Sequence, residues 1–175
     1  SIAKQLFFKD NHLYGSVSSF ESFFRCPYQY YLKSGLKLYV QKPFTIDSSL
    51  MGTISHAVFE KSVKNAGKDY PNHGLRQLNE LIDPMFDDLK RLYPKQVARI
   101  NSIQSRAKQL IQESLKYFSE LESHTEYEPL AVEVEFNQSI KVDDHKEVHL
   151  KGYIDRVDAH DEYFRIIDYK SSKKT

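Results

Sequence analysis

Tryptophan is absent from this 175-residue sequence, and cysteine occurs once, at Cys26. A single cysteine excludes an intrachain disulfide and a zinc site built from cysteines alone. Neither sign of charge is in excess, since the formal net charge is +1, so a nucleic-acid surface must come from a local basic patch. No apolar run reaches the ~18 residues of a membrane span, and no signal peptide is recognisable. We therefore expect a soluble, cytoplasmic protein with no membrane partner.

Apolar and aromatic side chains, by contrast, are abundant. Hydrophobic residues make up 40% of the sequence, which includes 12 Tyr and 11 Phe. This supply is enough for a hydrophobic core, in which we expect most of the aromatic residues to lie. The length fits a single domain over 1–175. Helical spacing of apolar residues occupies about 16–123, and an alternating pattern occupies about 129–170.

The helical part is delimited by capping residues and by proline. Ser18-x-x-Glu21 has the pattern of a capping box. Pro27 is expected to interrupt the first helix and to open a short second one that ends at Gly35. Apolar residues at helical spacing predict further helices over about 48–65, 75–92 and 95–121.

The period of the apolar residues changes to two after Pro129. From Leu130 to Phe136, every second residue is apolar, which predicts a half-buried strand. Two more strands are expected over about 146–159 and 162–170. Helices followed by an antiparallel meander indicate an α/β or α+β domain. The meander stops close to the chain end and would leave a bare sheet edge, so we expect the chain to be a fragment of a longer protein.

The last two strands carry an acidic pattern. A two-residue turn at 160–161 would place Asp155 opposite Ile166, with Asp168 and Lys170 on the following strand. Side chains alternate with period two, so Asp155, Asp168 and Lys170 would project from one face. Diagonal neighbours in such a pair have backbones about 7–8 Å apart, which lets two carboxylates converge.

Converging carboxylates favour a hard cation such as Mg²⁺ or Mn²⁺. Such an ion can activate water and stabilise charge on a phosphate. We therefore predict Asp155, Asp168 and Lys170 as catalytic residues, with both aspartates as metal ligands and Lys170 at the water or the phosphate. The alternative is a solvated acidic face. The apolar pair Ile166 and Ile167 weighs against it, because it suggests a strand that is buried on both faces.

These motifs resemble those of a known nuclease superfamily. Gly-Tyr-Ile-Asp-Arg-Val-Asp at 152–158 and Ile-Asp-Tyr-Lys-Ser-Ser at 167–172 are similar to the PD-(D/E)XK nucleases, and to their RecB-type branch in particular. Gly52-x-x-x-His56 resembles a helical motif of that branch, and the resemblance implies that His56 is a metal ligand beside Asp155 and Asp168. A lone helical histidine is more often structural, so the acidic hairpin carries this prediction.

The resemblance extends to a subfamily. The run Ser-Val-Ser-Ser-Phe-Glu-Ser-Phe-Phe-Arg-Cys-Pro-Tyr-Gln-Tyr-Tyr at 16–31 is similar to the start of the nuclease domain in the AddB/RexB subunits of bacterial helicase–nucleases. In AddB proteins, a cysteine at the place of Cys26 joins three C-terminal cysteines around a 4Fe–4S cluster. Those three are absent here, so we expect no cluster in this chain. Cys26 would be an iron–sulfur ligand only if a longer parent chain supplied them, and a small buried side chain is the preferred interpretation.

The resemblance implies a fold and a function. The fold is a restriction-endonuclease-like core, a mixed sheet flanked by helices, with extra N-terminal helices and a truncated C-terminus that lacks the family's Gln-x-x-x-Tyr helix. The function is Mg-dependent DNA exonuclease activity in an AddAB/RexAB-type complex, acting in double-strand break repair and homologous recombination. No Walker A motif is present, so an AddA/RexA-like partner subunit would supply the helicase activity that feeds the DNA strand to the nuclease. Alternatives are a Cas4-like or stand-alone RecB-type exonuclease, and a catalytically inactive DNA-binding or subunit-docking module.

Other charged residues are weaker candidates for the site or for a DNA surface. Glu133 or Glu135 could contribute a further acid near the metal. Neither is counted as a ligand, because alternating glutamates on an exposed strand face need no special cause. Arg99 and Arg106 share one helix face and could contact phosphates, although such cations more often only face solvent. Arg156, inside the acidic motif, is expected to form an ion pair or a phosphate contact.

Overall fold

The structure is a computed structural model that describes residues 2–10, 12–38, 48–143 and 146–170. Its contacts divide the chain into two compact units. The first unit is made of Ser1–Phe44 and Glu135–Tyr153, and the second is made of Thr45–Val134 and Ile154–Thr175. The elements, in chain order, are α1 (Ile2–Phe7), β1 (Phe8–Lys9), β2 (His12–Ser16), α2 (Val17–Arg25), α3 (Pro27–Tyr30), η1 (Tyr31–Gly35), α4 (Ser48–Ala66), η2 (Gly67–Asp69), α5 (Tyr70–Arg76), α6 (Leu78–Leu92), η3 (Pro94–Gln96), α7 (Val97–Ser123), β3 (Glu128–Asp143), β4 (Lys146–His160) and β5 (Tyr163–Ile167).

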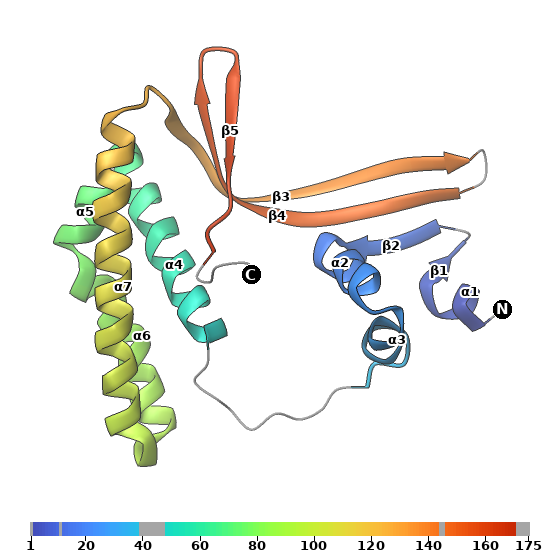
Figure 1. Ribbon diagram of the computed structural model, residues 1–175, viewed down its shortest axis with the longest axis horizontal. Coiled ribbons are helices and arrows are strands. Elements are labelled where there is room, and N and C mark those ends of the chain that lie inside the picture. Colours follow the sequence, from blue (N-terminus) through green and yellow to red (C-terminus); the bar gives the residue numbers. More distant parts are fainter. Residues whose placement is uncertain (1, 11, 39–47, 144–145, 171–175) are drawn as a thin grey trace. The chain divides into compact units, whose positions relative to one another are not determined.

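The strands form one mixed sheet of five strands. Its order is β1-β2-β4-β3, and β5 also pairs with β4 (Figure 1). β2 runs parallel to β4, whereas β1 pairs with β2 and β5 pairs with β4 in the antiparallel sense. A mixed sheet accompanied by helices confirms the predicted fold class. The strands β1 and β2 are not among the predicted ones, because they are short and precede the periodic part of the sequence.

In the first unit, β2 leads directly into α2. Ser16 is the N-cap of α2, since its side chain accepts from the backbone N–H of Ser19 and the Ser19 side chain accepts from the backbone N–H of Ser16. The capping box predicted at Ser18 and Glu21 is therefore wrong, because the helix already begins at Val17. Pro27 opens α3 as expected, and the turns that follow end at Gly35.

Gly152 lets an aromatic ring approach the backbone of β4 in the first unit. A Cβ at this position would lie 2.7 Å from the ring of Phe136. Real Cβ atoms essentially never come that close, so Phe136 packs directly over the bare main chain. The glycine of the acidic motif therefore has a structural role.

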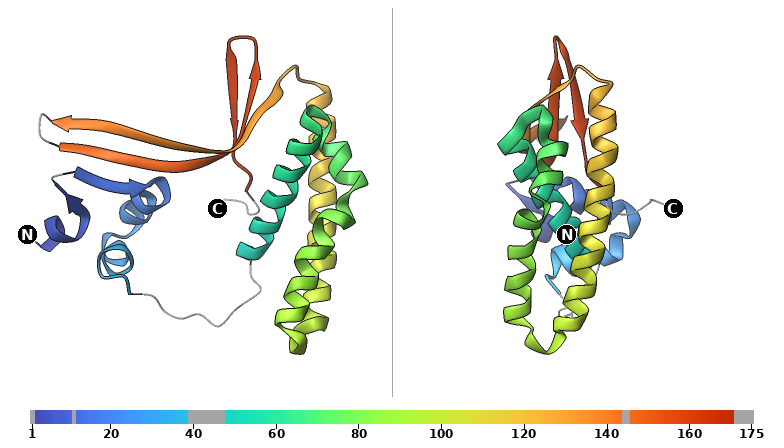
Figure 2. Two further views of the ribbon diagram at one scale, coloured as in Figure 1. Left: turned by 180° about the vertical axis from the view of Figure 1, so that it is seen from behind. Right: turned by 90° about the vertical axis from the view of Figure 1, so that its left-hand side faces the viewer.

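In the second unit, α4, α5, α6 and α7 lie side by side (Figures 1 and 2). α4 and α7 match the predicted helices closely. The predicted helix over 75–92 is instead two helices, α5 and α6, because Gln77 leaves the helical conformation between them with φ −103° and ψ 12°. In the described part of the chain, every helix is too short or too polar to cross a lipid bilayer.

The hydrophobic core of the second unit is formed mainly by these helices. Tyr169, just after β5, also belongs to it. Its most deeply buried apolar side chains are Val58, Tyr70, Ile82, Phe86, Ile100, Ala107, Ile111 and Leu115. The chain segments that carry the predicted site are thus anchored on a helical core.

The hairpin of β4 and β5 differs from the predicted one by two residues. His160 pairs with Tyr163 and Arg156 pairs with Ile167, so the turn lies at Asp161 and Glu162. A shift of two residues keeps every side chain on its predicted face. β5 ends at Ile167, however, so Asp168 and Lys170 follow the strand.

The prediction that this last strand is buried on both faces is wrong. Ile166 is 67% exposed and Phe164 is 66% exposed, whereas Ile167 packs against the core. Only one face of the strand is covered, so the apolar pair Ile166 and Ile167 does not indicate a strand that is buried on both faces. The predicted alternation in β3 also fails at its start, where Leu130 is 64% exposed and Glu133 adopts a positive φ of 51°.

Candidate metal centre

A histidine and two carboxylates converge in the second unit. His56 lies on α4, Glu133 on β3 and Asp155 on β4, and one ligand atom from each lies within 4.8 Å of the others. Nδ1 of His56 is 3.4 Å from Oδ1 of Asp155. The two side chains are 32% and 14% exposed, so the cluster is partly shielded but open to small ions.

The peptide groups of Tyr169 position two of these three residues. The carbonyl oxygen of Tyr169 lies 2.8 Å from Nε2 of His56, and its N–H donates to Oδ2 of Asp155 at 2.7 Å. A helix and a strand are thereby fixed to one residue. The chain leaves β5 just before this point, so the Asp155 carboxylate accepts the N–H in place of a strand carbonyl.

These bonds determine what faces the centre of the cluster. A carbonyl oxygen can only accept, so Nε2 of His56 carries a hydrogen and donates it. In the neutral imidazole, Nδ1 then presents a lone pair towards Oδ1 of Asp155. Two lone pairs that face each other repel unless a cation or a proton lies between them. The donor set of one imidazole and two carboxylates therefore fits a divalent cation such as Mn²⁺ or Mg²⁺.

Asp168 and Lys170 lie beside this cluster at a pocket. Together with His56 they line a cavity of about 210 Å³. Their side chains are more than half exposed, and Nζ of Lys170 is 2.7 Å from Oδ1 of Asp168. The structure thus brings His56 and Asp155 together and adds Glu133, while Asp168 is paired with Lys170 and is not a member of the three-residue group. The role of Asp168 as a metal ligand remains a prediction.

Comparison with known sequences identifies the family. The sequence profile of the PD-(D/E)XK nuclease superfamily matches residues 15–175. The chain belongs to the PD-(D/E)XK nuclease superfamily. The match covers both units, and it includes His56, Asp155 and the Asp-x-Lys motif at 168–170.

Within this superfamily, the chain is similar to subunits of bacterial helicase–nucleases. It is 31% identical over 191 residues to an ATP-dependent helicase/deoxyribonuclease subunit of Symbiobacterium thermophilum, with 94% of this chain covered. It is 30% identical over 170 residues to the exonuclease/helicase subunit RexB of Lactococcus lactis subsp. cremoris, with 91% covered. The resemblance inferred from the sequence is confirmed. The chain spans 16% and 15% of the lengths of these two relatives.

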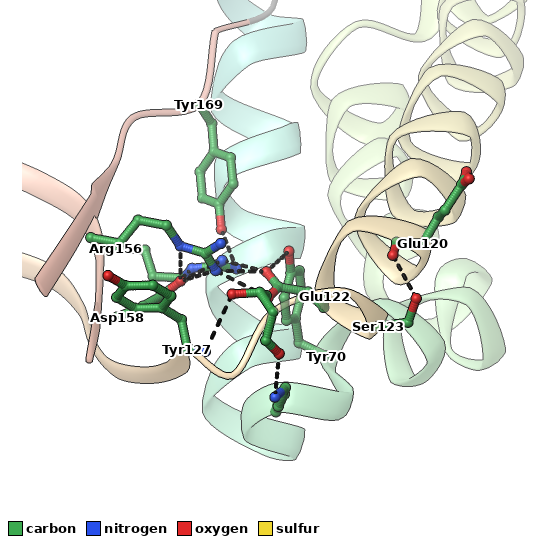
Figure 3. A network of polar contacts seen from close by, with 11 residues as sticks. Tyr70, Glu120, Glu122, Ser123, Tyr127, Arg156, Asp158 and Tyr169 are labelled. Carbon is green, nitrogen blue, oxygen red and sulfur yellow. Dashed lines mark hydrogen bonds and ion pairs between the residues drawn. The ribbon is translucent and has the colours of Figure 1, made fainter. Parts of the chain in front are cut away.

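Arg156 and Asp158, which belong to the acidic motif at 152–158, form a buried ion-pair network that contacts Tyr169. Arg156 is 1% exposed, and its guanidinium lies 2.7 Å from both Glu122 and Asp158 (Figure 3). It also donates to the hydroxyl of Tyr169 at 3.2 Å, and it lies 4.6 Å above the ring of Tyr70. Of the two roles predicted for Arg156, the structure supports the ion pair, because a side chain so buried cannot reach a phosphate.

A second arginine completes this buried network. Arg165 of β5 forms ion pairs with Glu122 at 3.0 Å and with Asp158. Two guanidiniums and two carboxylates balance, so no net charge is buried. The network reaches Tyr169 at its hydroxyl, and the peptide groups of the same residue contact His56 and Asp155.

The two tyrosine hydroxyls of this network stay protonated. Burial raises the pKa of Tyr169 to about 12, despite an opposing effect of Arg156. Burial also raises the pKa of Tyr70 well above its ordinary value. Neither hydroxyl therefore changes charge near neutral pH.

Sequence reasoning considered Glu133 as a further acid near the metal but did not count it as a ligand, whereas the structure places it in the cluster. The alternation of β3 suggested a plain solvated glutamate, but the positive φ of Glu133 marks an irregularity in the strand. Alternation alone cannot reveal such a bend. Arg99 and Arg106, the weak candidates for DNA contact, are exposed on α7.

Proposed function

We propose that this chain is a nuclease module that hydrolyses phosphodiester bonds of DNA with Mg²⁺ or Mn²⁺. The observation that carries the proposal is the arrangement of His56, Glu133 and Asp155, whose donor atoms converge next to the pocket of Asp168 and Lys170. Membership of a nuclease superfamily supports the reaction class. The donor set supports the dependence on a hard divalent cation.

Each residue of the site has a role in this proposal. His56, Glu133 and Asp155 would hold the cation, and Asp168 would complete the set by turning away from Lys170. The cation would lower the pKa of a water molecule and stabilise negative charge on the phosphate. Lys170 would bind the phosphate or orient the water, since its side chain is 59% exposed at the pocket. Tyr169 would keep His56 and Asp155 in place through its peptide groups.

The similarity to bacterial helicase–nuclease subunits suggests the setting. We propose that the chain acts as an exonuclease within an AddAB/RexAB-type helicase–nuclease, with an AddA/RexA-like partner subunit, in double-strand break repair by homologous recombination. The relatives are named as helicase/deoxyribonuclease subunits, which favours this setting over a stand-alone or Cas4-like exonuclease.

The test combines metal binding with DNA cleavage. Asp155→Asn should abolish Mn²⁺ binding at this site, measured by electron paramagnetic resonance, and should reduce cleavage of end-labelled DNA by more than about 100-fold, since even residues behind a metal ligand contribute 10–100-fold. Lys170→Ala should bind Mn²⁺ nearly as well but cleave slowly. Asp161→Asn, in the exposed turn of the same hairpin, is the matched control and should behave like the parental chain.

Two outcomes would contradict the proposal in different ways. If the Asp155 and Lys170 variants both cleave at the parental rate, the cluster is not the active site. If the parental chain binds DNA and Mn²⁺ but cleaves neither linear nor circular DNA, the chain is a binding or docking module. Circular single-stranded DNA distinguishes an exonuclease, which needs an end, from an endonuclease, which does not.

A further inference from the structure

A second group of potential metal ligands lies in the first unit. His12 is on β2, and Glu147 and His149 are on β4, with one ligand atom from each within 4.8 Å of the others. β2 and β4 are parallel neighbours in which Tyr14 pairs with His149. Side chains alternate along a strand, so these three residues and Tyr14 share one face of the sheet.

The ring of His149 is held on several sides. Its Nδ1 lies 2.7 Å from Oγ of Ser139, on β3, and its Nε2 lies 3.7 Å from Oε2 of Glu147. The ring of Tyr14 stacks on it at 4.5 Å, and the ring of His12 meets it edge-on at 5.4 Å. When Nδ1–H donates to Ser139, Nε2 presents its lone pair towards Glu147, which is the usual arrangement of a metal-binding histidine.

His12 adds an independent observation. Its Nδ1 is buried, and among the residues that the structure describes it has no hydrogen-bond partner. A buried polar atom without a partner costs about 1–3 kcal/mol, and a cation bound by this nitrogen would remove that cost. The side chains of Glu147 and His149 are 29% and 23% exposed, so an ion can reach the group from solvent.

We infer that His12, Glu147 and His149 bind a transition-metal ion of the Zn²⁺ class. Two imidazole nitrogens and one carboxylate are a known donor set for Zn²⁺, whereas the cluster at His56 offers one imidazole and two carboxylates. Donors at 2.0–2.1 Å from a tetrahedral ion lie about 3.3 Å apart. Small side-chain rotations would bring the three ligands to that spacing.

The ion would act as a cross-link between β2 and β4. Among the buried apolar side chains of the described residues, Tyr30 alone belongs to the first unit. A small unit with so little core gains stability from a metal that joins distant segments of its chain. The site is therefore structural, and it does not depend on the proposed nuclease function.

Zn²⁺ titration of the chain tests this inference. In a His56→Gln, Asp155→Asn background, which removes ligands of the other cluster, calorimetry should show one Zn²⁺ equivalent bound. Adding Glu147→Gln or His149→Gln should weaken that binding by more than about 100-fold, more than the 10–100-fold typical of a residue behind a metal ligand. His160→Gln, a histidine further along β4, is the matched control and should change the affinity little. No Zn²⁺ binding, or binding that survives the Glu147 and His149 substitutions, would overturn the inference.

A second measurement uses the parental chain and so does not depend on whether the variants fold. Long-range ¹H–¹⁵N spectra of the histidine rings should show His12 and His149 shifting when Zn²⁺ is added near neutral pH in excess of the two clusters. X-ray absorption should show two imidazole ligands at about 2.0–2.1 Å. If the His12 and His149 resonances stay in place, or if the spectrum shows only oxygen ligands, His149 and Glu147 form an ordinary ion pair and the inference is wrong.

Discussion

The two units of this chain use similar side chains in opposite ways. In the second unit, Phe86 and Tyr70 are fully buried among helices, and even the charged Arg156 is out of contact with water. In the first unit, Phe24 is 83% exposed and Tyr28 is 69% exposed. The expectation that most aromatic residues lie in the core is therefore wrong. Aromatic content alone does not indicate a core, because burial depends on whether opposing helices cover the rings.

The largest effect is expected at the buried network of the second unit. Arg156→Met removes a partner of the buried carboxylates Glu122 and Asp158, which should lower the free energy of unfolding by about 3–5 kcal/mol. Arg25→Met, at an exposed position of the first unit, should change it by less than about 0.5 kcal/mol. Urea unfolding followed by circular dichroism measures both. Equal effects would show that the network is not what distinguishes the units.

A pair of phenylalanine truncations sharpens the same comparison. Phe86→Ala creates a cavity in the core and should cost about 3–5 kcal/mol, whereas Phe24→Ala should cost less than about 0.5 kcal/mol. Hydrogen exchange should show that the Phe86 variant loses protection in α4 to α7. Loss of protection in α2 and β2 as well would mean that the two units unfold together.

Alkaline pH probes the link between the network and the site. The pKa of Tyr169 is raised from 10 to about 12 in the folded chain, so the fold favours its protonated form. That contribution is complete below about pH 10 and is lost as the pH rises to about 12. In Tyr169→Phe, the unfolding free energy should vary less steeply with pH in this window. The difference in slope should correspond to at most about one proton bound by the folded state. A parental slope in the Tyr169 variant would contradict the argument.

The smallest effect is expected at Cys26, which caps α3 in the first unit. Its sulfur accepts from the N–H of Gln29 at 3.5 Å, and a serine hydroxyl serves such a cap at least as well. Cys26→Ser should therefore change the free energy of unfolding by less than about 0.5 kcal/mol, while Ser16→Ala, which removes the cap of α2, should cost about 1 kcal/mol. Thermal unfolding followed by circular dichroism measures both. A loss above about 2 kcal/mol for Cys26→Ser would mean that the thiol does more than cap.

The parts of the fold that could be predicted are those set by local patterns. α4 and α7 follow from apolar spacing over many turns, and the faces of the hairpin follow from strict alternation. The meeting of His56 with Asp155 was inferred from a motif. Its physical basis, two bonds to the main chain of Tyr169, involves residues 113 and 14 positions apart and is invisible in any local window.

The parts that could not be predicted depend on tertiary contacts or on single backbone angles. The turn of the hairpin lies one residue later than expected and contains Asp161 at a positive φ. The pairing partner of each β4 residue is therefore two positions further along the chain. Glu133 joins His56 and Asp155 at another positive φ, which no propensity for glutamate suggests. β2 is recognised as a strand only through its pairing with β1 and β4.

The two main-chain bonds from Tyr169 to His56 and Asp155 have a consequence for mutational tolerance. The two bonds that align His56 with Asp155 use only the N–H and the carbonyl oxygen of one residue, which every amino acid except proline can supply. Substitutions at this position can therefore alter the stability of the second unit without removing the two bonds that align His56 with Asp155. In directed evolution, position 169 should accept changes that adjust the robustness of the module, and only proline there should remove activity by breaking the alignment itself.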